Sequence, residues 1–215
     1  MLTRSLTTTY LPSHTPQVHC FTNESMAALL HATRSIEALV SHYFAPLQAL
    51  AGKAHLERTA SKAVVTVPYF MLQGTGSLNA NSVNLLGRQL AATLQCPVEV
   101  RLVRLQAPYL DAHVLAQFLS IELASTTFRK AMLTLFTLVG PIKRTDQAPT
   151  GALLGVKVRL AGRLLLEASR PRQTVQVEAL GSFASHSLHT LQAASHTATN
   201  TKGTYTVKVW LCVKA

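Results

Sequence analysis

The chain has 215 residues, 48% of them hydrophobic and 13% charged, and 20 Lys and Arg against 9 Asp and Glu give it a formal net charge of +11. This composition excludes a disordered polar chain, and 9 Pro with 10 Gly exclude collagen-like and low-complexity classes. A packed globular protein of one large domain or two small ones is expected.

The excess positive charge lies in the C-terminal part of the chain. Residues 1–128 hold 8 Lys or Arg and 6 Asp or Glu, a net charge of +2, whereas residues 129–215 hold 12 and 3, a net charge of +9. Such asymmetry is typical of proteins that bind a polyanion. Nucleic acid is the favoured partner and an acidic membrane surface the alternative, although no apolar stretch is long enough to span a bilayer.

The N-terminal half predicts an extension followed by alternating helices and strands. Apolar residues at helical spacing predict helices over residues 24–51 and 79–94, with Pro46 expected to break or restart the first. β-Branched alternation predicts strands over 63–70 and 98–102. We expect residues 1–22 to form an extension, 52–61 a polar connection and 73–77 a glycine turn.

The C-terminal half predicts two helices followed by a sheet. Asp111 is a plausible N-cap for a helix to about residue 124, and Ser125 for a second helix through residue 138. After a loop over 140–154, β-like segments at 155–166, 173–180 and 204–213 predict one sheet packed by both helices. Leu188 and Leu191 belong to a fourth strand or to a short turn. A domain boundary is expected in or near 105–111.

Basic residues alternate with apolar ones in these strands. In the strand at 155–166, Lys157 and Arg159 lie on the side opposite the expected buried face, and in the strand at 204–213 Lys208 and Trp210 do the same. Cations on strands and adjoining turns could neutralise many phosphates, so binding should weaken steeply with salt. The candidate RNA-binding residues are Arg129, Lys130, Lys157, Arg159, Arg163, Arg170, Arg172, Lys202, Lys208 and Trp210.

Residues for other chemistry are sparse. The chain has only two aspartates, and its glycine segment at 73–76 completes neither a Walker motif nor GxGxxG, so we expect no enzyme, no cofactor and no small-molecule substrate. His186, His189 and His196 lack a neighbouring Cys or an HExxH spacing, and the three cysteines share no CxxC spacing. Neither a metal site nor a disulfide framework is predicted.

Five blocks in the second half resemble a known family. They read LVRLQAPYLDAHVLAQFLS at 102–120, FRKAML at 128–133, GVKVRLAGRL at 155–164, SLHTL at 187–191 and GTYTVKVWL at 203–211. Their order and spacing are similar to the universal small-subunit ribosomal protein family "S three". The resemblance implies an α+β fold, with a degenerate type II KH-like domain at 23–106 and a C-terminal α/β domain at 107–215 whose mixed sheet is packed by two helices.

Departures from the family imply an organellar, mitochondrial version. The stretch GTGSLNAN at 74–81 stands at the family's KH clamp loop and carries no positive charge, and Leu133 stands where a third cation would follow Arg129 and Lys130. The resemblance implies a structural role in the small subunit in the mitochondrial matrix, bound to its rRNA in the head where mRNA enters. It implies mRNA and neighbouring head proteins as further partners. The alternative is a free KH-type RNA-processing factor.

Overall fold

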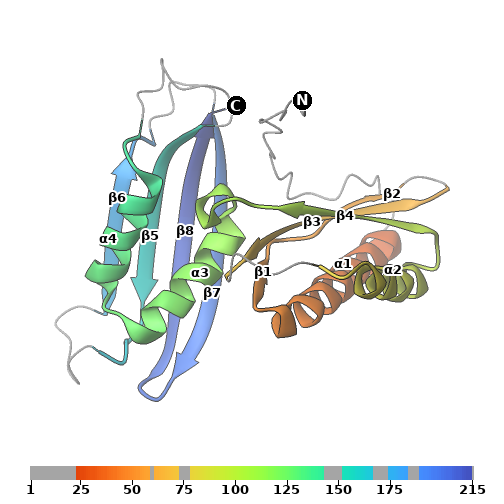
Figure 1. Ribbon diagram of the computed structural model, residues 1–215, viewed down its shortest axis with the longest axis horizontal. Coiled ribbons are helices and arrows are strands. Elements are labelled where there is room, and N and C mark those ends of the chain that lie inside the picture. The colour runs from red at the N-terminus through yellow and green to blue at the C-terminus, as the bar shows by residue number, and fades with distance from the viewer. Residues whose placement is uncertain are drawn as a thin grey trace. The chain divides into compact units, whose positions relative to one another are not determined.

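The computed structural model describes residues 23–58, 61–72, 78–142, 152–166, 174–183 and 189–214. These residues form two compact units that divide in the sequence between Pro108 and Tyr109, here called the first and the second unit. Both units combine helices with a sheet, which confirms the α+β class (Figure 1). The extension at 1–22, the turn at 73–77, His186, Arg170 and Arg172 lie outside the described residues.

The first unit is a sheet with two helices on one face (Figure 1). Strand β3 (Ala63–Met71) is central, because it pairs antiparallel with β1 (Ala49–Ala51) and β2 (His55–Arg58) and parallel with β4 (Val98–Arg104). Helix α2 (Ala80–Leu94) connects β3 to β4 and provides the crossover that a parallel pair needs. The predicted strands 63–70 and 98–102 and the predicted helix 79–94 are therefore confirmed.

The core of the first unit follows from the periodicity of its elements. Val65 and Val67 point from β3 toward the helices, where Leu86 and Leu90 of α2 and Ile36 of α1 (Asn23–Phe44) meet them. All five side chains are buried. Burial of an aliphatic side chain contributes about 1.5–3 kcal/mol, so this cluster holds the helices on the sheet.

Two expectations for the first unit are corrected. The break expected at Pro46 is confirmed, but the helix predicted over 24–51 does not resume after it: the helix ends at Phe44, a short 3-10 turn follows at Ala45–Leu47, and Gln48 adopts a left-handed conformation with φ of 50°. Pro46 cannot donate a helical hydrogen bond, so the chain leaves the helix and residues 49–51 pair with β3 instead. The predicted polar connection 52–61 contains β2, whose Leu56 is buried.

The second unit is a four-stranded sheet with both helices on one face (Figure 1). The strand order is β6 (Val175–Gly181), β5 (Leu153–Ala161), β8 (Gly203–Lys214) and β7 (His189–Asn200). Helix α3 (Ala112–Ser125) packs over β7 and β8, and α4 (Phe128–Val139) contacts β6. Val156, Val158 and Val209 are fully buried beneath the helices.

Local chemistry fixes the helix starts in the second unit. Asp111 caps α3 as predicted, since its Oδ1 accepts hydrogen bonds from the backbone N–H of His113 at 2.8 Å and of Val114 at 3.1 Å. The predicted cap of the second helix is wrong, because Ser125 ends α3 and Thr127 precedes α4. A buried hydrogen bond of 2.8 Å from the Tyr205 hydroxyl to the Ser120 carbonyl ties α3 to β8.

The sheet of the second unit corrects two further expectations and decides one open alternative. It is not mixed, because all three strand pairs are antiparallel. Both described helices of this unit precede the strands, and among the described residues no helix lies between two strands to connect parallel neighbours. The first strand ends at Ala161 and not at residue 166, since Gly162 turns the chain with φ of 127°. The open choice around Leu191 resolves into β7, a strand of 12 residues.

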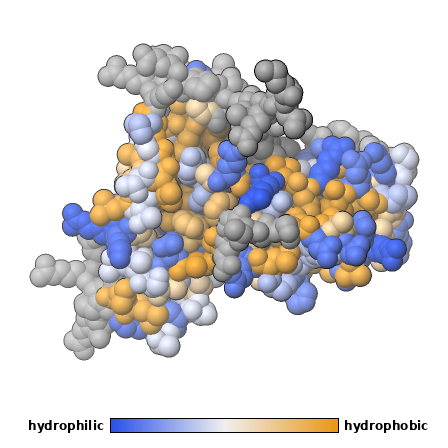
Figure 2. All heavy atoms as spheres, viewed as in Figure 1, coloured by the Kyte–Doolittle hydropathy of each residue, from blue (hydrophilic) through white to orange (hydrophobic). Residues whose placement is uncertain are grey.

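Some apolar side chains stay at the surface of the helical layer. Ile121 of α3 and Leu133 of α4 are 47% and 60% exposed. Figure 2 shows hydrophobic residues beside hydrophilic ones on the face of the molecule that it views. Within the described ranges, no helix combines the length and apolarity that crossing a membrane requires.

Candidate nucleic-acid interface

The face of the second sheet that lies opposite the helices carries the predicted basic residues. Side chains alternate along a strand, so burial of Val156, Val158 and Val209 on the helical side places Lys157, Arg159 and Lys208 on the other. These three side chains are exposed, and Trp210 beside them is half-buried. We call Lys157, Arg159, Lys208 and Trp210 the basic face.

Strand register brings these four residues together. Lys157 lies directly opposite Trp210, and Arg159 lies directly opposite Lys208. The Nζ of Lys157 is 5.6 Å from the centre of the Trp210 ring, a cation–π contact. Residues directly opposite in an antiparallel pair have Cβ atoms about 4.5–5.5 Å apart, so Arg159 and Lys208 form a like-charge pair that destabilises the free sheet.

No acidic side chain of the described strands balances this charge. Glu178 is the one carboxylate in β5 to β8, and it lies opposite Val158, hence on the helical side. A like-charge pair without a carboxylate nearby costs folding free energy that a bound polyanion would recover. Lys157, Arg159 and Lys208 therefore form a cluster of positive charge that no carboxylate of the described strands compensates.

The basic face continues in one direction that the sequence prediction omitted. Lys214 follows Lys208 at even spacing on β8, with Cys212 between Trp210 and Lys214. Cys212 is buried under Leu154 and Phe183, and this burial raises the pKa of its thiol. The alternation Lys208, Trp210, Cys212, Lys214 was the signal that could have added Lys214 to the candidates.

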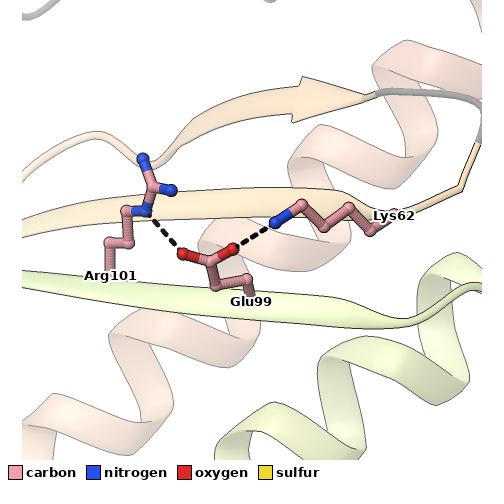
Figure 3. A network of polar contacts seen from close by, with 3 residues as sticks. All are labelled: Lys62, Glu99 and Arg101. Atoms are coloured by element: carbon pink, nitrogen blue, oxygen red, sulfur yellow. Dashed lines mark hydrogen bonds and ion pairs between the residues drawn. The ribbon is translucent and has the colours of Figure 1, made fainter.

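The first unit shows the opposite arrangement of charge. Glu99 of β4 accepts hydrogen bonds from the Nζ of Lys62 at 2.7 Å and from the Nε of Arg101 at 2.8 Å (Figure 3). The pKa of the Glu99 carboxyl lies below its usual value, mainly because of the Lys62 hydrogen bond and then that of Arg101. These two cations already have a carboxylate, so they are weaker candidates for phosphate binding than the basic face.

The other predicted residues fall into separate groups. Arg129 and Lys130 are exposed in the first turn of α4, on the helical side of the sheet, so the structure does not bring them together with the basic face. Arg163 and Lys202 lie at one end of the sheet, where Asn200 bonds to the backbone of both. The Nδ2 of Asn200 donates to the Arg163 carbonyl at 2.8 Å, and its Oδ1 accepts from the Lys202 amide at 2.9 Å.

The histidines of β7 do not form a metal site with other described residues. His196 lies on the helical side of β7, opposite Val207, and burial lowers the pKa of its imidazole. Among the described residues, no three His, Cys, Asp or Glu side chains group as metal ligands would.

Comparisons with known proteins relate the chain to mitochondrial ribosomal proteins. A family model described as "Mitochondrial ribosomal protein (VAR1)" matches residues 51–214. A protein of Mycosarcoma maydis described as "Small ribosomal subunit protein uS3m" is 29% identical over 183 residues, which cover 76% of this chain and 68% of that protein. The range matched by the family model includes the basic face and the first turn of α4.

Proposed function

Because the chain belongs to the family of mitochondrial ribosomal proteins described as VAR1, we propose that it is a structural, RNA-binding constituent of the small subunit of the mitochondrial ribosome. Its place of action is accordingly the mitochondrial matrix. The observation that carries the RNA-binding role is the basic face, where Arg159 opposes Lys208 and no described carboxylate compensates.

The ligand of the basic face is small-subunit rRNA. The side chains of Lys157, Arg159 and Lys208 contact phosphates of the backbone, and such contacts fix position without reading sequence. Trp210 adds an aromatic surface on which an unpaired base can stack. Arg163 and Lys202 extend the charged surface beyond the strands. Arg170 and Arg172 are further candidates for contact with rRNA by their charge alone.

Arg129 and Lys130 serve a different contact. They lie on the other side of the sheet, in a helix turn that has no acidic residue. We propose that they contact mRNA where it enters the small subunit and that the protein lies in the head. Leu133 lies one turn further on and is 60% exposed, but it carries no charge. Two cations should therefore bind mRNA more weakly here than three would.

The first unit is the degenerate KH-like domain, spanning residues 23–106, and residues 107–215 form the ribosomal α/β domain. The sequence of a helix, antiparallel strands, a helix and a strand parallel to β3 supports this assignment. Residues 74–81 carry no positive charge, so a clamp on single-stranded RNA is not expected there. The first unit then serves contacts with neighbouring proteins of the head.

The test removes charge from the basic face and follows incorporation into the subunit. Lys157→Gln, Arg159→Gln and Lys208→Gln together remove three positive charges. The matched control removes three exposed cations of the first unit, by Lys53→Gln, Arg58→Gln and Arg88→Gln. We expect the first variant to be lost from small subunits in a density gradient and the control to remain.

The outcomes separate the proposal from its alternative. Equal incorporation of both variants would remove rRNA anchoring from the basic face. A wild-type protein that sediments slowly and free of small-subunit rRNA would favour a free RNA-processing factor instead.

A further inference from the structure

Strand β7 has an exposed edge that pairs with no other described strand. It is the last strand of the sheet order β6-β5-β8-β7, and it pairs with β8 without a bulge from His189 to Asn200. Residues 190–200 contain no Lys, Arg, Asp, Glu or Pro. Proteins protect edge strands with Lys, Pro, bulges or short length, and β7 uses none of these over 12 residues.

The hairpin geometry identifies the backbone groups of this edge. A turn of two residues joins β7 to β8, so the closing pair Asn200 and Gly203 must exchange both of its hydrogen bonds. Every second residue of β7 counted back from Asn200 then bonds to β8. The N–H and C=O groups of the residues between them point outward: Leu191, Ala193, Ser195, Thr197 and Thr199, all exposed.

We propose that this edge binds an extended segment of a neighbouring protein of the small subunit, which adds as a fifth strand beside β7. The inference rests on the proposed function, because it takes the partner from the subunit. An alternating row of donors and acceptors is matched by another peptide backbone. Phosphate oxygens only accept hydrogen bonds, so contacts with RNA phosphates would leave the outward carbonyls of β7 unpaired, and the donors of RNA, its 2′-OH and base groups, do not form an alternating row like that of a peptide backbone.

The side chains along β7 define the partner further. Ala194 and Ala198 pack on the core beneath α3, so partner residues on that side lie beside a helix and are expected to be apolar. On the opposite side, where Ser195 and Thr197 are exposed, partner residues are expected to be polar. A second copy of this chain fits poorly, because antiparallel pairing of two β7 strands would align both basic faces on one side without a carboxylate from these strands between them.

Backbone hydrogen exchange tests the proposal on the wild-type protein. It is measured by mass spectrometry on peptides from residues 190–200, for the free chain, for the chain mixed with naked small-subunit rRNA, and for purified small subunits. The five outward amides should exchange fast in the first two samples. In subunits they should slow by about a hundredfold or more, as amides in a formed ladder do.

A photocrosslinker at Thr197 identifies what covers the edge. We expect a crosslink to a peptide of another protein in purified subunits, reduced at least tenfold by Ser195→Pro and unchanged by the control Ser195→Val. The proline removes an outward N–H and no bond to β8. A crosslink to a second copy, crosslinks to RNA with none to another protein, or unprotected amides in the subunit would each overturn the inference. Absence of the chain from small subunits would instead contradict the proposed function.

Discussion

Replacing Lys208 by Gln should move folding and RNA binding in opposite directions. Lys208 lies directly opposite Arg159, and no carboxylate of the described strands lies on that face. Removing a like-charge cross-strand pair should raise the free energy of unfolding by about 0.2–1 kcal/mol. The same change should remove one phosphate contact and lower the salt slope of RNA binding by about 0.7–0.9. A fourfold rise in salt should then cost the wild type about threefold more affinity than it costs the variant.

One spectroscopic probe serves both measurements. Trp210 is the only tryptophan of the chain and lies on the basic face, so its fluorescence reports urea unfolding of the free protein and titration with an rRNA fragment. The matched control is Lys62→Gln, which removes a cation already bonded to Glu99 and should lower stability with little change in the salt slope. A Lys208→Gln variant that loses stability, or that keeps the salt slope, would refute this account of the basic face.

Three further predictions concern glycine geometry, pH and the helical side of the sheet. Gly162→Ala should lower the free energy of unfolding by about 2–5 kcal/mol, because the added Cβ would lie 2.6 Å from backbone atoms of β8. Gly203 has a similar φ but open space around it, so Gly203→Ala should lower the free energy of unfolding by only about 1–3 kcal/mol. Urea melts measure both. Burial lowers the pKa of His196 below its ordinary 6.5, so the unfolded chain binds the proton first as the pH falls. The free energy of unfolding should therefore fall as the pH drops below 6.5 and level off below the folded pKa. His196→Gln should flatten this dependence in a plot of stability against pH between about 7.5 and 5. Arg129→Ala with Lys130→Ala should spare incorporation into subunits and slow translation of mRNA with stable hairpins; lost incorporation would assign these cations to rRNA.

The sequence predicted those elements whose local signals agree with their tertiary surroundings. The β-branched run around Val65 forms a buried strand, and Asp111 caps a helix through its own carboxylate. Strands β1 and β2 could not be read locally, because residues 49–51 continue the composition of a helix and become a strand only by pairing with β3. Strand β7 is rich in Ala, Ser and Thr, so its own sequence predicts a strand only weakly, and it forms by pairing with β8.

The candidate site was predictable in its parts but not in its arrangement. Alternation along each strand indicated that Lys157 and Arg159 share a face. The pairing of Arg159 with Lys208 depends on the register of two strands that are far apart in sequence. Nor could the sequence separate Arg129 and Lys130 from that face, because the side of the sheet on which α4 packs is a tertiary property.

The most direct test of the central claim is ultraviolet crosslinking of small subunits purified from mitochondria by density gradient, with crosslinked peptides identified by mass spectrometry. The account predicts that this chain is present in the small-subunit fraction and that rRNA nucleotides are attached to peptides of β5 and β8, at Lys157, Lys208 or Trp210. rRNA crosslinks confined to the helices α3 and α4, with none on these strands, would contradict it.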